Sequence, residues 1–217
     1  DSCDQEVKDS MAHGFTDRYY NTKIRLALTK IAANTRESYD ALKEGIQYFE
    51  ERYNENHKMY LFGEFSRLYY DMVLGNHPAL IEQLTEIHER MKLQQHNNYR
   101  KRNFAMATYY YWMGDIETGN RYLFSEIFMI RNLSQRATGF YHETTALHKL
   151  REHEPQQAIQ LLRQAQEVFA SVASYSQIPK HNISVLETTP VEKIVVKFWQ
   201  GDSFLQDTYY LDLRITW

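Results

Sequence analysis

The chain is poor in the residues that interrupt helices, with only 8 glycines and 4 prolines among its 217 residues. Because sheet proteins need frequent tight turns, this scarcity favours long helices joined by short turns. Cysteine is nearly absent as well: Cys3 stands alone, so one chain can form neither an internal disulfide nor a thiolate metal site. Such cysteine usage suits a reducing compartment, and we expect a cytoplasmic protein.

Long apolar runs and a basic surplus are also lacking. No stretch approaches the roughly 20 apolar residues that a membrane-spanning helix needs, so we expect no membrane partner. The formal net charge is −3, whereas proteins that bind nucleic acids usually carry an excess of Lys and Arg against the phosphates. We therefore expect no direct nucleic-acid contact from this segment of chain.

Residues of the kinds used in catalysis show no recognisable arrangement. His142 and His148 are six residues apart, which places them about 120° from each other around a helix, whereas a zinc pair needs a spacing of four. Neither a glycine-rich phosphate loop nor a nucleophile elbow occurs, and Cys3 lies in a polar terminus. The sequence thus predicts no catalytic site, no metal and no cofactor, and we expect a binding protein rather than an enzyme.

Apolar residues recur at helical spacing along most of the chain. Between residues 60 and 74 they follow steps of three and four, which places them on one face of a helix. Gly75 ends this helix, and Pro78 opens the next one at a position that has no donor to lose. The same unit of helix, turn and helix returns around Gly114 and around His153.

The turns of these three units, at Gly75, Gly114 and His153, are 39 residues apart each time. A fixed period of this kind marks stacked helical hairpins, in which no unit buries its apolar face alone. An earlier pair of helices, joined at Asn34 and Thr35, fits one more unit. After a terminal segment at 1–15, the expected helices are 16–33, 36–53, 60–74, one beginning at Pro78, 104–113, 116–130, 140–151 and 155–173.

The end of the chain carries two conflicting signals. Leu211 and Leu213 alternate with polar residues, as in a half-buried strand, which would make the tail a β-hairpin. The sequence from Thr189 to Glu192, however, is a capping box with Pro190 at the first helical position. We therefore predict a last helical hairpin within 189–217, with helices at 190–199 and 203–215, preceded by one long loop at 175–188.

Two of the units carry residues of the tetratricopeptide repeat. Around Gly114 these residues are Ala107, Tyr110, Gly114, Asp115 and Gly119, and the next unit supplies Ala146, Ala158, Ile159, Leu162 and Ala165. Small residues at such positions let neighbouring helices approach closely. Over residues 16–174 the chain therefore resembles a tetratricopeptide-like protein. The resemblance implies an all-α fold, a right-handed array of about five antiparallel helix hairpins in a single repeat domain over residues 1–217.

The period departs from the usual tetratricopeptide length of roughly 34 residues. This lengthened form resembles the repeat domain of the peptide-sensing bacterial regulators of the Rap, Rgg and PlcR group, which act in quorum sensing and transcription regulation. The resemblance implies a sensing domain whose concave face binds a short peptide or an extended segment of a partner protein, and a homodimer is compatible with it. In such a regulator a DNA-binding module would precede Asp1. A protein-interaction scaffold or adaptor without a sensing role is the alternative.

The groove positions follow from the register of the repeat motif. Aromatic side chains there would provide anchor pockets, and charged ones would hold peptide termini or side chains. The alternative is that several of these aromatic residues pack between hairpins. The resemblance assigns peptide binding to Phe62, Phe65, Tyr69, Val73, Lys101, Phe104, Thr108, Tyr111, Trp112, Phe140, Glu143, Leu147 and Arg151.

Overall fold

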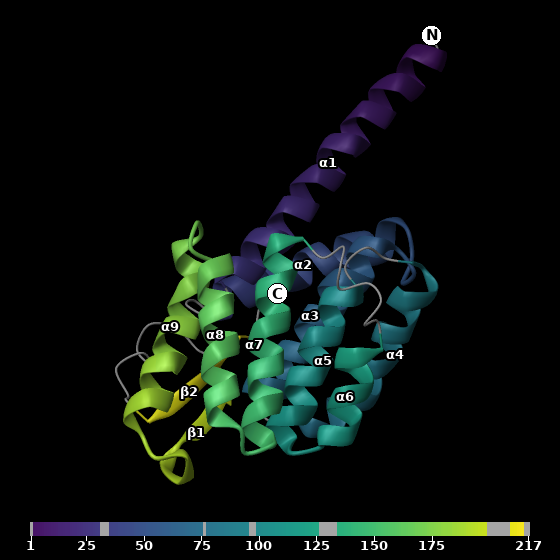
Figure 1. The fold of residues 1–217 in the computed structure, drawn as a ribbon. Helices are drawn as coiled ribbons and strands as arrows, with labels where there is room; N and C mark the ends of the chain where they lie inside the picture. Colours follow the sequence, from purple (N-terminus) through teal and green to yellow (C-terminus); the bar gives the residue numbers. More distant parts are fainter. Residues whose placement is uncertain are drawn as a thin grey trace. The chain divides into compact units, whose positions relative to one another are not determined.

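A computed structural model describes residues 2–30, 35–75, 77–95, 99–125, 134–198 and 209–214. These residues are mostly helical, with one small two-stranded sheet, which confirms the predicted all-α class at this level. The chain forms two compact units, one over residues 1–97 and the other over residues 98–215 (Figure 1).

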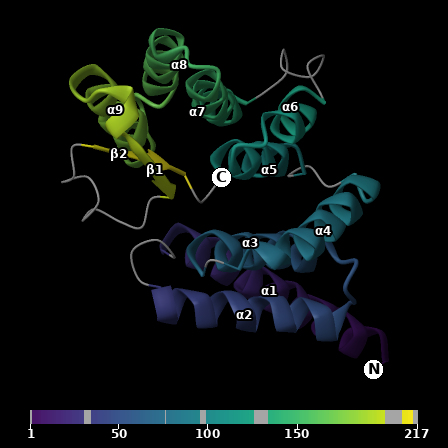
Figure 2. The same ribbon diagram turned by 90° about the horizontal axis from the view of Figure 1, so that it is seen from below.

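In the first unit each helix packs on the next (Figure 2). α1 (Ser2–Lys30) packs on α2 (Thr35–Arg52), α2 packs on α3 (Lys58–Leu74), and α3 packs on α4 (Ile81–Leu93), which follows the short 3-10 helix η1 (Pro78–Leu80). With 29 residues, α1 is much longer than the 18-residue α2, and its beginning extends past its partner. The core of this unit is apolar and includes Ile24, Leu42, Phe49, Leu61 and Leu84.

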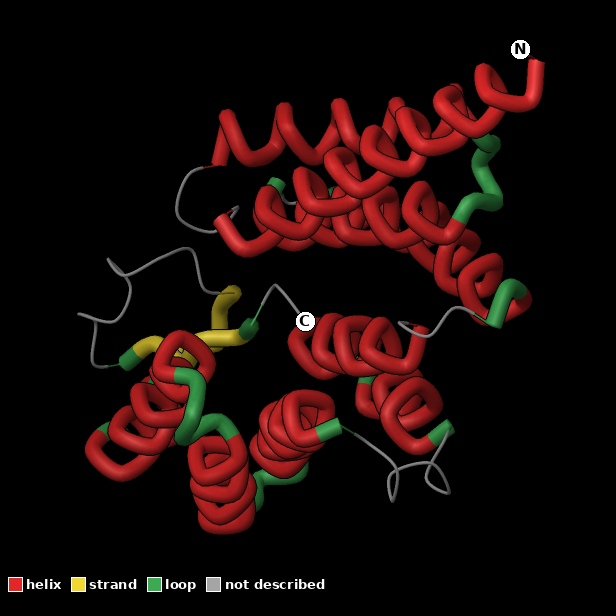
Figure 3. Tube along the Cα trace, turned by 90° about the horizontal axis from the view of Figure 1, so that it is seen from above, coloured by secondary structure: helices red, strands yellow, loops and turns green. Residues whose placement is uncertain are grey.

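The second unit combines helices with a short sheet (Figure 3). α5 (Tyr99–Met113) and α6 (Ile116–Phe124) form a hairpin, and α7 (Gln135–Arg151) packs on both. α8 (Pro155–Val168) packs on α7 and on α9 (Ala173–Thr188). The chain then passes through the 3-10 helix η3 (Val191–Lys193) into strands β1 (Val195–Phe198) and β2 (Tyr210–Leu213), and β2 packs on α9.

Two turns of the second unit follow directly from their residues. Gly114, between α5 and α6, has a φ of 86°, which glycine adopts without strain, and the Asp115 carboxylate caps α6 by accepting from the Thr118 amide. His153, between α7 and α8, has a φ of 62°, and Pro155 then occupies the first turn of α8. The predicted pairs of helices at these two turns are confirmed.

Most of the predicted helices are present, with boundaries shifted by a few residues. The first helix begins well before residue 16, at Ser2, and the predicted helix over 116–130 is confirmed as far as Phe124. Some predictions fall outside the described residues, namely those on Asn34, residues 126–130, residues 199–208 and residues 215–217.

The predicted loop over residues 175–188 is wrong, because these residues form most of α9. The Ser, Pro, Asn and His residues of this stretch suggested a loop, and Pro179 lacks the amide that a helix interior uses. In the structure Ile178, Ile183 and Leu186 are buried on this helix, which packs on α8. Burial of an apolar stripe has thus overridden an unfavourable local residue.

The predicted last helical hairpin is also wrong where the structure describes it. Residues 195–198 form β1 and residues 210–213 form β2. Val195 and Val196 are β-branched and favour an extended backbone, which explains the strand. The alternative of a β-hairpin does not hold either, because the two strands pair in parallel, with Val195 opposite Tyr210.

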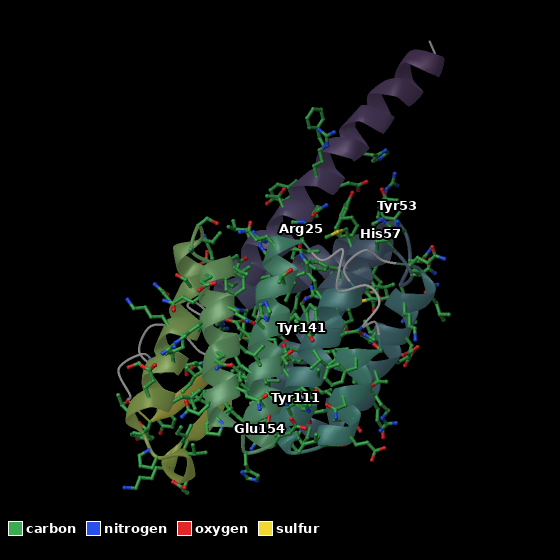
Figure 4. All side chains as sticks on the ribbon, in the orientation of Figure 1. Arg25, Tyr53, His57, Tyr111, Tyr141 and Glu154 are labelled. Atoms are coloured by element: carbon green, nitrogen blue, oxygen red, sulfur yellow. The ribbon has the colours of Figure 1, made fainter. Side chains whose placement is uncertain are left out.

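Three rings stack on one another where α2 is joined to α3 in the first unit. The rings of Tyr53 and His57 (Figure 4) stack with centroids 4.3 Å apart. Phe49 stacks on His57 with 4.9 Å between ring centroids. The His57 imidazole also accepts a hydrogen bond from the Met59 amide and so caps the first turn of α3. Burial in this cluster lowers the pKa of His57.

Candidate segment-binding site

Residues 209–214 of the second unit, the tail segment, lie against its helices, with residues 210–213 in extended conformation. β2 makes up most of this segment and packs on α9. Arg214, the residue after β2, reaches α7. The tail segment thus contacts the helical face on which several peptide-binding residues were predicted.

Main-chain groups of the tail segment are bonded on two sides. On one side the Val195 amide donates to the Tyr209 carbonyl at 3.0 Å, next to the pairing of β1 with β2. On the other side Asn182 of α9 donates from Nδ2 to the Asp212 carbonyl and accepts from the Asp212 amide, each at 2.8 Å. The side-chain amide of Asn182 therefore satisfies the main-chain donor and acceptor of Asp212 on this edge of β2, as a paired strand would.

His181, the residue before Asn182, extends this contact along the segment. Its Nε2 lies 2.9 Å from the Tyr210 carbonyl oxygen and 3.6 Å from the carboxylate of Asp212, whose side chain is fully buried. α9 therefore recognises mainly the backbone at residues 210 and 212. This is the mode by which proteins commonly bind extended peptides.

Arg214 ends the tail segment in a buried ion pair. Its guanidinium donates through Nε and Nη2 to the two carboxylate oxygens of Glu143 on α7, both at 2.8 Å. The side chains of Arg214 and Glu143 are only 5% and 8% exposed, respectively. A bidentate ion pair of this kind is among the strongest charge-assisted contacts, and it requires the planar guanidinium of arginine.

Aromatic rings surround the same guanidinium. Its central carbon lies 5.4 Å from the ring centroid of Phe140, 5.2 Å from that of Phe169 and 5.0 Å from that of Tyr175. Aromatic faces attract a cation at such distances, most strongly where water is excluded. Glu143, Phe140, Phe169 and Tyr175 together form the arginine pocket.

Because of Pro179 in α9, the Tyr175 carbonyl oxygen is a further acceptor in the arginine pocket. In a regular helix the amide of residue 179 would donate to the carbonyl of residue 175, but proline has no amide hydrogen. The Tyr175 carbonyl is therefore released from the helix ladder, and Arg214 donates to it from Nη2 at 2.7 Å. The proline that suggested a loop is thus part of the construction of this pocket.

Beside the arginine pocket, Leu211 and Leu213 of the tail segment leave a small cavity between themselves and the helices. Leu211 and Leu213 are 2% and 6% exposed, and they line a cavity together with residues of α5, α7, α8 and α9. This cavity has room for about one water molecule. Its helical lining includes Thr108, Leu147, Leu150, Leu162 and Ile178.

Strand β1, the neighbour of the tail segment, contacts α5 through Trp112. The indole Nε1 donates to the Val196 carbonyl at 3.0 Å, and the indole ring packs edge-on against Phe198 with 5.2 Å between centroids. Trp112 therefore contacts extended chain through both its donor and its ring.

The structure brings part of the predicted site together in the second unit. Glu143 and Phe140 form the arginine pocket, Thr108 and Leu147 line the adjoining cavity, and Trp112 contacts β1. Each of these residues contacts or faces an extended piece of the chain itself. Their predicted binding of a separate peptide stays a prediction.

Other predicted residues of this unit stabilise its helices. The Tyr111 hydroxyl donates to Asn120 of α6 at 2.8 Å, and its ring lies where any side chain on Gly119 would collide with it. Arg151 donates to the carbonyls of Tyr111 and Trp112 at 2.6 and 2.7 Å, which caps the end of α5. Burial raises the pKa of Tyr111 and lowers the pKa of Arg151.

Two more predicted residues of the second unit lie on α5. Phe104 is buried and faces Tyr141 of α7, with 6.3 Å between ring centroids. Lys101 lies in the first turn of α5 and is half-buried. Neither residue appears in the lining of the cavity beside the tail segment.

The predicted residues of the first unit, all on α3, are buried within that unit. The Phe62 ring lies 5.4 Å from the guanidinium of Arg25 on α1, and the Phe65 ring lies 6.2 Å from the His88 ring on α4. Tyr69 and Val73 are buried as well. These side chains pack between helices, and peptide binding by them stays a prediction.

Sequence reasoning missed the contribution of α9 and the end of α8. Tyr175 and Asn182 were not singled out because residues 175–188 were expected to form a loop. Phe169, which lies within the predicted helix over 155–173, was not singled out either. One signal could have found two of them. Tyr175 and Asn182 are seven residues apart, which places both on one face once the segment is helical.

Comparisons with known proteins gave no match: no family model matches the chain, and neither does any curated protein or solved structure. Within the described ranges, no group of three His, Cys, Asp or Glu side chains is placed to hold a metal ion. None of the described helices combines the length and the apolar character needed to cross a bilayer.

Proposed function

We propose that this chain is a peptide-binding helical repeat domain that acts as the sensing part of a bacterial transcriptional regulator. The observation that carries the proposal is the way in which the second unit holds its tail segment. An asparagine side chain binds the main chain, a carboxylate and aromatic rings bind one arginine, and two leucines enter an apolar cavity. Helical grooves recognise extended peptides by the same means.

A tetratricopeptide-like array is the scaffold in this proposal. Support comes from the helix pairs joined by short turns and from small residues that are buried where helices meet. Gly119 lies against Tyr111, and Ala158 and Ala165 of α8 are completely buried. Arrays of this type present one long face to a ligand. A cytoplasmic location belongs to the proposal and is supported by the single cysteine.

Binding rather than catalysis suits the chemistry of the site. The Glu143 carboxylate is engaged by Arg214 through two hydrogen bonds, and the adjoining cavity is lined mainly by aliphatic side chains, together with those of Thr108, Thr144 and Asn182. Such a site fixes a charged side chain in place and excludes water around it. We therefore propose anchoring as the role of Glu143.

Calorimetric titration of the full chain with a pool of short, capped peptides tests the proposal. We expect at least one member of the pool to bind with a stoichiometry of one peptide per chain. If no peptide binds while a folded partner protein binds tightly, the peptide-sensing function is wrong and an adaptor role takes its place.

Amide hydrogen exchange separates sensing from passive binding. A sensing domain should change its protection at helices that do not touch the bound peptide, because binding biases the shape of the array. An adaptor without a sensing role should change only at the contact residues. Sedimentation velocity on the same samples shows whether the peptide alters a homodimer equilibrium.

A further inference from the structure

We infer that the arginine pocket is a ligand site, that the tail segment is its internal ligand, and that an external peptide of the same pattern displaces it. The pattern is an apolar residue, an aspartate, a second apolar residue and an arginine, as in the sequence from Leu211 to Arg214. This inference rests on the proposed peptide-binding function and specifies the ligand of that function.

The preference for arginine follows from the geometry of the pocket. Arg214 makes two hydrogen bonds to Glu143 and one to the Tyr175 carbonyl while its plane lies among aromatic rings. The ammonium group of lysine is a compact point charge that cannot form the bidentate pair with the Glu143 carboxylate. A lysine at this position would therefore leave part of the buried carboxylate without its partner.

The rest of the segment is recognised largely through its main chain, with the buried Asp212 carboxylate beside His181. Asn182 and His181 bind main-chain groups of residues 210 and 212, which any peptide carries. The two leucines enter an apolar cavity that they leave partly empty. An external segment with apolar side chains at the same two places and an aspartate between them can make every one of these contacts.

The arginine pocket is built by helices that pack on one another independently of the tail segment. Phe140 and Glu143 lie on α7, Phe169 lies at the end of α8, and Tyr175 lies on α9. α7 packs on α8, and α8 packs on α9. Gly139 of α7 allows close contact with the Phe169 ring, since a side chain at this position would collide with it. The pocket therefore persists when its occupant leaves.

The tail segment, in contrast, has little structure of its own. Among the described residues it pairs with β1 alone, in a two-stranded sheet of four residues per strand, and such small sheets have little independent stability. Val195 and Tyr209 at one end of this pairing are 47% and 44% exposed. Detaching the segment thus disturbs far less structure than opening the helices, which makes exchange with an external peptide feasible.

Titration of the full-length Arg214→Lys variant with a labelled, capped peptide of residues 209–214 tests the inference. Because the substitution weakens the internal competitor, we expect this variant to bind the peptide about tenfold more tightly than the unmodified chain. A control peptide with lysine in the last place should bind about tenfold more weakly than the arginine peptide. Equal affinities for the two peptides, or no binding to the folded variant, would overturn the inference.

A second measurement on the unmodified chain covers the case in which the Arg214→Lys variant does not fold. Excess arginine peptide should accelerate hydrogen exchange at the Asp212 amide, because its bond to Asn182 is lost when the tail segment leaves. Unchanged exchange at this amide contradicts displacement. If other peptides bind while this amide stays protected, the inference fails and the proposed function stands; if no peptide binds at all, both fail.

Discussion

α3 of the first unit and α7 of the second unit are each 17 residues long, yet they bury different kinds of side chain. The buried residues of α3 are mostly large and apolar, including Phe62, Phe65 and Tyr69, and they pack against neighbouring helices. The buried residues of α7 are mostly small or polar, such as Gly139 and Thr144.

This difference indicates what each face can bind. A face of large apolar side chains is complemented by another helix, because helix surfaces offer apolar stripes of the same kind. The small side chains of α7 let α5, α6 and α8 approach it closely, and its polar side chains include a partner for a charge. This residue is Glu143, and Arg214 of the tail segment is its partner.

The largest effect is expected from truncation of Phe65 on α3. This side chain is 1% exposed, so Phe65→Ala should lower the free energy of unfolding by roughly 3–5 kcal/mol. Urea unfolding followed by circular dichroism measures the loss. A stable variant with weakened peptide binding would instead make Phe65 a binding residue and would remove the contrast between the two helices.

A loss of similar size is expected from Glu143→Ala on α7, for a different reason. The substitution leaves the guanidinium of Arg214 buried without its carboxylate, which costs roughly 3–5 kcal/mol in comparable cases. Glu64→Ala on α3 is the matched control, since Glu64 pairs with the partly exposed Arg67 and should contribute about 1 kcal/mol or less. Urea unfolding measures both losses. Equal losses in the two variants would show that the arginine pocket stabilises the fold no more than a partly exposed ion pair does.

A smaller effect is expected from Gly139→Ala, which places a methyl group against the Phe169 ring. Overpacking of this kind costs roughly 1–3 kcal/mol and should also displace a wall of the arginine pocket. Gly14→Ala on α1 is the control, because nothing lies within 4 Å of the added atom and the helix should gain about 0.5–1 kcal/mol. Thermal unfolding of both variants measures the difference, and a shift of the same sign in the two would contradict it.

The mildest effect is expected from acid, through His142 and His148 of α7. Burial lowers the pKa of both imidazoles, so the folded chain keeps them neutral at pH values where the unfolded chain takes up protons. The free energy of unfolding should therefore fall as the pH drops below about 6.5, the ordinary value for histidine. Urea unfolding at pH 7.5 and pH 5.5 measures this slope, and His148→Asn should flatten it; an unchanged slope would show that His148 does not contribute.

Local sequence rules were sufficient for most of the helices and for two turns. Gly114 and His153 were recognised because they interrupt the helical spacing of the apolar residues at a constant period of 39 residues. In the structure both residues have a positive φ. The same rules failed at Pro179, since its cost is outweighed by contacts that come from other parts of the chain. β1 and β2 were missed for a related reason: their parallel pairing links residues 195 and 210 and depends on the support of α9.

The candidate site was predictable only in part. The repeat register selected Glu143, Leu147 and Trp112 because these residues lie on the first helices of the hairpins. It could not select Tyr175 or Asn182, because they lie on α9, a proline-containing helix that was predicted to be a loop. Nor could it reveal that the extended segment in contact with this face belongs to the chain itself.

The central claim, that the helical face of the second unit is a peptide site occupied by the tail segment, is tested most directly by exchange at one amide. Hydrogen exchange of the Asp212 amide should be measured in the unmodified chain with no peptide, with the arginine peptide and with the lysine peptide. The account predicts faster exchange with the arginine peptide and little change with the lysine peptide. Equal exchange under all three conditions would contradict it.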